Sequence, residues 1–152
     1  DNFYLKFHLN KFIKGNADLT QRTYQMYVYL RKAGRKQALA PVRLVNKTQN
    51  ISPISMEKFH NEIQIAIRKD TLQFLRVIKA IPGDMWVLQS DKTIEFAYDE
   101  VLDLKIPFDL LEIKSGETLE FVFINANYGL KDFYIPNEMV LSVTRPALVS
   151  AK

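Results

Sequence analysis

Hydrophobic and polar side chains alternate with a period of two along most of the chain. Residues 2–9, NFYLKFHL, place Phe and Leu on one face and polar or aromatic side chains, Tyr4 among them, on the other. Residues 24–31, YQMYVYLR, do the same, with Tyr27 and Tyr29 opposite the aliphatic residues. This alternation is typical of half-buried β-strands, because successive strand side chains point to opposite sides of a sheet.

The same pattern predicts further short strands with turn signals between them. Residues 32–36, KAGRK, predict a hairpin turn around Gly34, followed by a returning strand at 38–45. One unbroken strand over residues 59–68 would place Phe59 on the same face as the isoleucines. Other strands are expected at residues 71–81, 85–90, 93–99, 101–107, 118–126 and 138–144, with a short helical turn at 109–113.

About ten short strands separated by turns predict an all-β protein. We expect an antiparallel β-sandwich of the carbohydrate-binding-module type, with one or two short helical turns. The length of 152 residues suits a single domain over residues 1–152. No apolar run is long enough to span a membrane, and the chain begins directly in an expected strand without a leader. We therefore expect a domain excised from a larger chain, with no membrane partner.

The charges are distributed unevenly, although the net charge is only +4. Residues 1–50 contain ten Lys or Arg and two acidic residues, whereas residues 51–152 contain eleven and fifteen. Either the two parts pack together and neutralise each other, or the basic part forms a face for an anionic partner. No basic run is interleaved with aromatic residues in an RNA-binding pattern, so nucleic acid is not an expected partner.

Cysteine is absent, which excludes disulfides, Cys nucleophiles and Cys-based metal sites. This absence slightly favours a cytoplasmic location without fixing the compartment. The two histidines, His8 and His60, lie far apart without metal-ligand spacing, and no nucleophile elbow or phosphate-binding loop is present. Asp103 lies near Asp99 and Glu100 in the sequence. These carboxylates could bind a cation or sugar hydroxyls, or they could face only solvent. The sequence therefore predicts no catalytic residue, metal or cofactor in this fragment.

Aromatic residues on the non-core strand faces are the clearest candidates for ligand binding. Tyr27 and Tyr29 project from one sheet face about 7 Å apart, flanked by Gln25 and Arg31, and Tyr4 offers a similar ring on another strand. Rings exposed in this way form a platform on which a pyranose can stack. Two other interpretations stay open: the face packs on a neighbouring domain, or the rest of the chain covers it.

Two further regions carry candidate ligand-binding residues. Trp86, the only tryptophan, follows a Pro-Gly turn and suits either core packing or ligand stacking. The segment 125–134 is rich in Asn and Tyr, a composition that suits hydroxyl recognition. The candidate ligand-binding residues are Tyr27, Tyr29, Arg31, Trp86, Asn125, Asn127, Tyr128 and Tyr134.

A longer pattern occupies residues 93–136: a strand with an acid, then IPF, a Leu-rich turn, K-x-G-(D/E), and an apolar strand. It resembles the C-terminal β-sandwich of family 57 glycoside hydrolases, the α-amylase and amylopullulanase-like group. Residues 1–9 also resemble the opening strand of that domain. Similar strands occur in family 9 carbohydrate-binding modules and in DOMON-type sandwiches, which bind sugars or haem. The matching residues are Asp103, Ile106, Pro107, Phe108, Leu110, Leu111, Lys114, Gly116 and Glu117.

The same segment has a physical interpretation of its own. Leu102, Leu104, Ile106 and Phe108 alternate inward, and a turn then leads into the apolar strand at 118–126. Such a strand, turn and strand form a corner that either joins two sheets or closes one edge.

The resemblance implies a non-catalytic accessory domain of a glycoside hydrolase that acts on α-glucans. In that family the catalytic carboxylates belong to a separate N-terminal barrel, so none is assigned here. The expected partners are an α-glucan or the parent catalytic domain. The alternative is a purely structural domain that packs on its neighbour and exposes an apolar patch when alone. Where many relatives have Gly after the Leu pair, this chain has Glu112.

Overall fold

The computed structural model describes eight ranges of the chain: residues 2–8, 24–42, 57–68, 71–89, 94–98, 101–127, 133–134 and 140–147. Within these ranges every strand pairing is antiparallel. They contain strands and turns, and no helix long and apolar enough to cross a membrane. The predicted all-β class is therefore confirmed.

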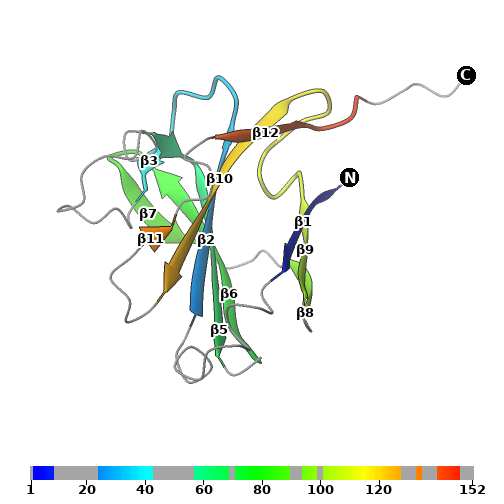
Figure 1. Cartoon of the computed structure of the whole chain (residues 1–152). Helices are drawn as coiled ribbons and strands as arrows, with labels where there is room; N and C mark the ends of the chain where they lie inside the picture. Colours follow the sequence, from blue (N-terminus) through cyan, green and yellow to red (C-terminus); the bar gives the residue numbers. More distant parts are fainter. Residues whose placement is uncertain are drawn as a thin grey trace, which may run out of the picture.

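The strands form two main sheets and one small one (Figure 1). The smaller main sheet has the order β1-β9-β8, with β1 at Asn2–His8, β9 at Val101–Pro107 and β8 at Glu95–Tyr98. The larger sheet has the order β11-β10-β2-β5-β6-β7, with β12 also paired to β10. Its strands are β11 (Phe133–Tyr134), β10 (Thr118–Asn127), β2 (Tyr24–Lys32), β5 (Asn61–Arg68), β6 (Thr71–Ile81), β7 (Met85–Leu88) and β12 (Leu141–Thr144). The third sheet pairs β3 (Ala40–Pro41) with β4 (Lys58–Phe59).

The main core lies between the two larger sheets, as a sandwich requires. Phe3 of β1 packs against Phe121 of β10, with ring centroids 5.1 Å apart, and against Phe108, 6.3 Å away. The predicted inward faces of residues 24–31 and 101–107 are confirmed, because their aliphatic side chains are buried in this core. Those side chains are Met26, Val28, Leu30, Leu102, Leu104 and Ile106.

The predicted corner, residues 108–117, links β9 of the smaller sheet to β10 of the larger one. Three successive i→i+3 hydrogen bonds, starting at the carbonyl of Pro107, make the expected helical turn. The turn ends in a Schellman pattern, because the amide of Ile113 donates to Phe108 and that of Glu112 to Asp109. Glu112 consequently has φ 57°, a left-handed conformation that usually selects glycine. This is the position at which many relatives of the resembled family have Gly.

Two predictions about strand pairing are wrong. The turn around Gly34 exists, but the described part of the predicted returning strand, residues 38–42, does not pair with β2; β2 pairs with β10 and β5, and β3 pairs with β4. The strand predicted over 59–68 is broken by a bend at His60. Because of that bend Phe59 packs on the opposite side of the sheet from Ile63. Period-two counting cannot detect a single residue that changes the phase of the alternation.

In the described part of the chain, opposite charges from the two unevenly charged parts of the sequence are paired with each other. Described basic residues from the first fifty positions form ion pairs with acidic residues from the remainder, as the first of the two interpretations expects. These pairs are Lys6–Asp103, Arg31–Glu57, Arg31–Glu120, Lys32–Glu117 and Arg35–Glu112.

Candidate functional site

The tyrosines predicted as a sugar platform, Tyr27 and Tyr29, lie on the outer face of the larger sheet, but the chain covers that face. Tyr29 is 0% exposed and packs against Phe59 and Trp86, with ring centroids 5.8 and 5.7 Å away. Tyr27 is 9% exposed, and its hydroxyl donates to Gln25 Oε1 at 2.6 Å. The expectation of two exposed rings is therefore wrong, and the third interpretation, cover by the rest of the chain, describes this face.

The other predicted residues of this face serve the same covering layer. Arg31 donates to Glu57 Oε2 at 2.6 Å and to Glu120 Oε1 at 3.0 Å, and its guanidinium lies over the Phe59 ring. The indole N–H of Trp86 donates to the carbonyl of Pro41 at 3.1 Å, which ties β7 to β3. Both side chains are thus bound to the protein itself, as core packing of Trp86 predicts.

The remaining predicted residues stay predictions. Asn125 and Asn127 lie in β10 and Tyr134 in β11, but their side chains are outside the described part of the structure, and Tyr128 is outside it altogether.

An open hollow lies on the three-stranded sheet. It has a volume of about 550 Å³, and every strand of that sheet contributes to its lining. Strand register explains which side chains share its face, because directly paired residues of antiparallel strands point the same way. Tyr4, Lys105 and Glu95 form one cross-strand row, and Lys6, Asp103 and Ala97 form the next. The alternate row contains Leu104, which is buried in the core, so the first two rows face outward.

Phe96 lines this hollow from the row of Leu104, and Tyr4 is the outward-facing aromatic residue of the lining. The side chain of Tyr4 is 67% exposed, in contrast to the buried rings of the larger sheet. The surrounding charges are paired: Lys6 Nζ lies 3.6 Å from Asp103 Oδ1, and Lys105 Nζ lies 3.3 Å from Glu95 Oε2. These pairs are exposed and longer than a tight charge-assisted hydrogen bond, so opening them for a ligand costs little. The hollow therefore offers an apolar ring face beside both donors and acceptors.

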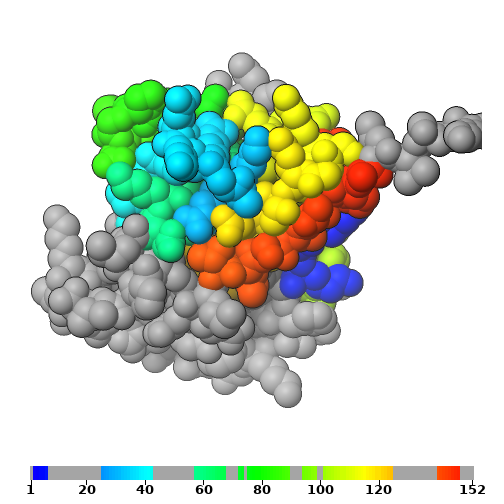
Figure 2. Space-filling model, turned by 90° about the horizontal axis from the view of Figure 1, so that it is seen from above, coloured from blue at the N-terminus to red at the C-terminus, as the bar shows by residue number. Residues whose placement is uncertain are grey.

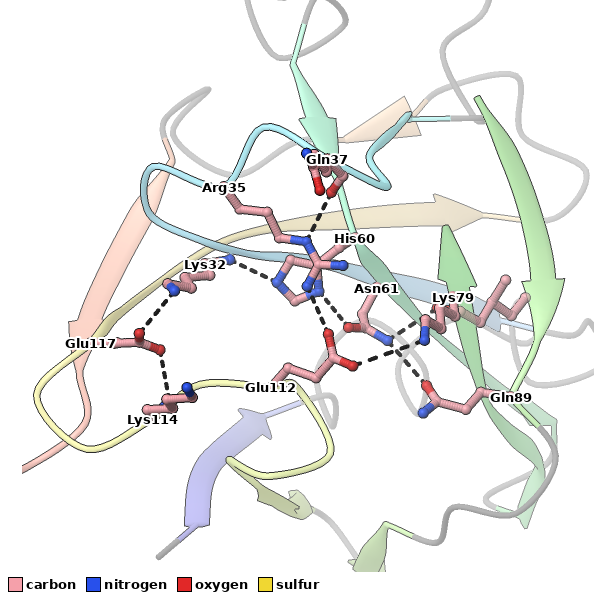
Figure 3. Close-up of polar contacts among 11 residues, drawn as sticks. Lys32, Arg35, Gln37, His60, Asn61, Lys79, Gln89, Glu112, Lys114 and Glu117 are labelled. Atoms are coloured by element: carbon pink, nitrogen blue, oxygen red, sulfur yellow. Dashed lines mark hydrogen bonds and ion pairs between the residues drawn. The ribbon is translucent and has the colours of Figure 1, made fainter. Parts of the chain in front are cut away.

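A second polar cluster surrounds His60 at one end of the sandwich (Figure 3). The ring of His60 is 1% exposed, and the amide of Lys32 donates to its Nε2 at 2.7 Å. Nδ1 therefore carries the proton and donates to Asn61 Oδ1 at 2.5 Å. Burial lowers the pKa of His60 to about 4, although the hydrogen bond with Asn61 opposes the shift. Both ring nitrogens are occupied, so His60 holds the end of β2 in place.

Glu112 joins this cluster from the corner between the sheets. It forms ion pairs with Arg35, at 2.8 Å, and with Lys79, at 3.9 Å. The hydrogen bond from Arg35 lowers the pKa of the Glu112 carboxyl, against the effect of partial burial. Figure 2 shows the same end of the molecule, where the corner (yellow) meets the loop after β2 (cyan) and the segment around β12 (orange to red). Glu112 thus fastens the corner to that loop.

The His60 cluster has no room for a ligand. The space beside it is about 10 Å³, enough for no more than a water molecule. Within the described ranges, no three His, Asp or Glu side chains are grouped so that they would hold a metal ion. The hollow beside Tyr4 is consequently the better candidate site. Tyr4 and Asp103 carried sequence signals as an outward aromatic ring and a strand-face acid, whereas Lys6, Lys105, Glu95 and Ala97 are brought together only by strand register.

Comparison of this chain with protein-family models, with curated proteins and with solved structures finds no match. The function is therefore argued from the sequence resemblance and from the geometry of the hollow.

Proposed function

We propose that this chain is a non-catalytic accessory domain of a glycoside hydrolase that acts on α-glucans, and that it binds saccharide in the hollow on the three-stranded sheet. The exposed Tyr4 ring beside two lysine–carboxylate pairs is the observation that carries the proposal. The resemblance of residues 93–136 to family 57 glycoside hydrolases supplies the substrate class.

The chemistry of the hollow suits a sugar. The face of a pyranose presents C–H groups that stack on an aromatic ring, and its edge presents hydroxyls that both donate and accept. Tyr4 supplies the ring, the carboxylates of Asp103 and Glu95 accept, and the ammonium groups of Lys6 and Lys105 donate. Weak binding is expected, because the site is open to solvent and its two aromatic residues, Tyr4 and Phe96, are largely exposed.

Isothermal titration with maltooligosaccharides and glycogen tests the proposal. We expect measurable heat for the wild type and roughly tenfold weaker binding for Tyr4→Ala, the loss that one stacking contact predicts. Leu88→Ala is the matched control, since it truncates a similarly exposed apolar side chain on β7, outside the hollow. The absence of heat for the wild type at millimolar saccharide would refute the binding role.

A second candidate function is purely structural: the domain packs on a neighbouring catalytic domain. The apolar side chains exposed on β7 favour it, because Met85 is 56% and Leu88 62% exposed at the edge of the larger sheet. Light scattering of the isolated chain tests this function. Self-association that Met85→Lys together with Leu88→Lys abolishes would support it, and a monomer at high concentration would count against it.

A further inference from the structure

The lining of the hollow extends farther across the strands than along them. It crosses all three strands of the β1-β9-β8 sheet but includes only two outward-facing rows. Two spacings between neighbouring strands amount to about 10 Å, whereas the two rows lie about 7 Å apart along each strand. The neighbouring pairs on the same face, Asn2–Pro107 and His8–Val101, are not part of the lining. A bound chain therefore has its longest support across the strands.

The two ends of this long axis differ in the size of the side chain that faces the hollow. Tyr4 is at one end, on β1, with its ring exposed to solvent. Ala97 is at the other end, on β8, and is the smallest side chain of the two outward rows. It is exposed, and it lies next to Asp103 in its own row and two residues from Glu95 on its own strand. There is therefore space above Ala97, which a larger side chain would fill. The two neighbouring carboxylates can accept hydrogen bonds from the hydroxyls of a ligand placed there.

We infer that the hollow holds two linked sugar rings laid across the strands, the first stacked on Tyr4 and the second over Ala97, and that Ala97 determines the length of saccharide bound. This inference rests on the proposed function, because it assumes that the ligand is a saccharide. The second ring receives its hydroxyl contacts from Asp103 and Glu95 and the first from Lys6 and Lys105. A third ring would extend beyond the lining and gain little.

A titration of the isotope-labelled chain with saccharides of increasing length, monitored by NMR, tests the inference. Methyl α-glucoside, maltose and maltohexaose are the probes. We expect maltose to bind roughly tenfold more tightly than the monosaccharide, as one additional set of ring contacts predicts, and maltohexaose within about threefold of maltose. Equal affinity for the monosaccharide and for maltose would overturn the two-ring site.

Substitution at Ala97 tests whether the second sugar ring lies over this residue. Ala97→Leu fills the floor and should reduce the affinity for maltose to that for methyl α-glucoside, which should itself be unchanged. Ala97→Ser is the matched control, because it adds one small polar atom and should preserve the difference. The thermal midpoint of each variant shows whether the fold is retained, and unchanged maltose affinity of a folded Ala97→Leu would overturn the role of Ala97.

The results separate this inference from the proposed function. If Tyr4→Ala weakens the binding of all saccharides equally but saccharide length has no effect on affinity, the saccharide site stands and the two-ring arrangement fails. If no saccharide binds the wild type, both fail together.

Discussion

The two outer faces of the sandwich both carry tyrosines, yet one face is closed and the other is open. On the larger sheet, Tyr29 is covered by Phe59 and Trp86, which come from separate short strands. On the smaller sheet, Tyr4 stands exposed above an open hollow. Both rings alternate with apolar neighbours in the same way along the sequence. The difference arises from which segments fold over each sheet.

This comparison separates two roles for an outward-facing aromatic ring. A covered ring contributes to stability by burying apolar area, which is worth about 25 cal/mol per Å². An exposed ring contributes almost nothing to stability and leaves its area available to a ligand. Mutations on the two faces should therefore affect different measurements.

Truncation of the covered ring should have the largest effect on stability. Tyr29→Ala removes a fully buried aromatic side chain and leaves a cavity between the sheet and its cover. We expect the free energy of unfolding to fall by about 3–5 kcal/mol, measured by urea denaturation. Tyr4→Ala is the paired control and should change it by less than about 0.5 kcal/mol. Similar losses for both variants would contradict the distinction between the faces.

Acid should weaken the covered side through His60, which holds the end of the strand that carries Tyr29. The folded-state pKa of about 4 lies below the ordinary value of 6.5. Between these values the unfolded chain binds the proton and the folded chain does not. Stability is therefore fully present above pH 6.5 and is lost as the pH falls toward 4, by up to about 3 kcal/mol.

Urea titrations at several pH values between 4 and 7 measure this loss. His60→Gln keeps an acceptor in place of the ring but does not titrate, so its stability should vary less over the same interval. A wild-type profile as flat as that of the variant would show that His60 is not the group responsible.

Loss of the hydrogen bond between Trp86 and Pro41 should lower stability by a smaller amount. Trp86→Phe keeps an aromatic ring beside Tyr29 but leaves the carbonyl of Pro41 without the indole N–H. The free energy of unfolding should fall by about 1 kcal/mol, measured by thermal or urea unfolding. Saccharide affinity should not change, because Trp86 lies outside the hollow. A change in affinity without a change in stability would reverse the roles assigned to the two faces.

Strand faces and the inter-sheet corner were predictable from local pattern. Met26, Val28 and Leu30 of β2 alternate into the core, and the apolar positions of β9 lead into the corner. These features depend on neighbours in sequence, which period-two counting detects. The resemblance to a glycoside hydrolase domain stays a prediction, since no comparison tests it.

The cover of the tyrosine face and the position of the hollow were not predictable in this way. Phe59 reaches Tyr29 only because the chain bends at His60, a phase change that the sequence pattern does not mark. The hollow requires Ala97 of β8 to align with Asp103 of β9 and Lys6 of β1. Such alignment is set by the register of pairing between strands, and sequence alternation specifies only the face of each strand.

The location of Trp86 has a practical consequence for spectroscopy. It is the only tryptophan, and it belongs to the covering layer, on the side of the larger sheet that faces away from the core. The hollow lies on the outer surface of the other sheet, so the core separates the indole from any bound sugar. Indole fluorescence should therefore report the loss of the cover during unfolding and stay constant during saccharide titration. The chain thus contains its own fluorophore for measuring stability independently of binding.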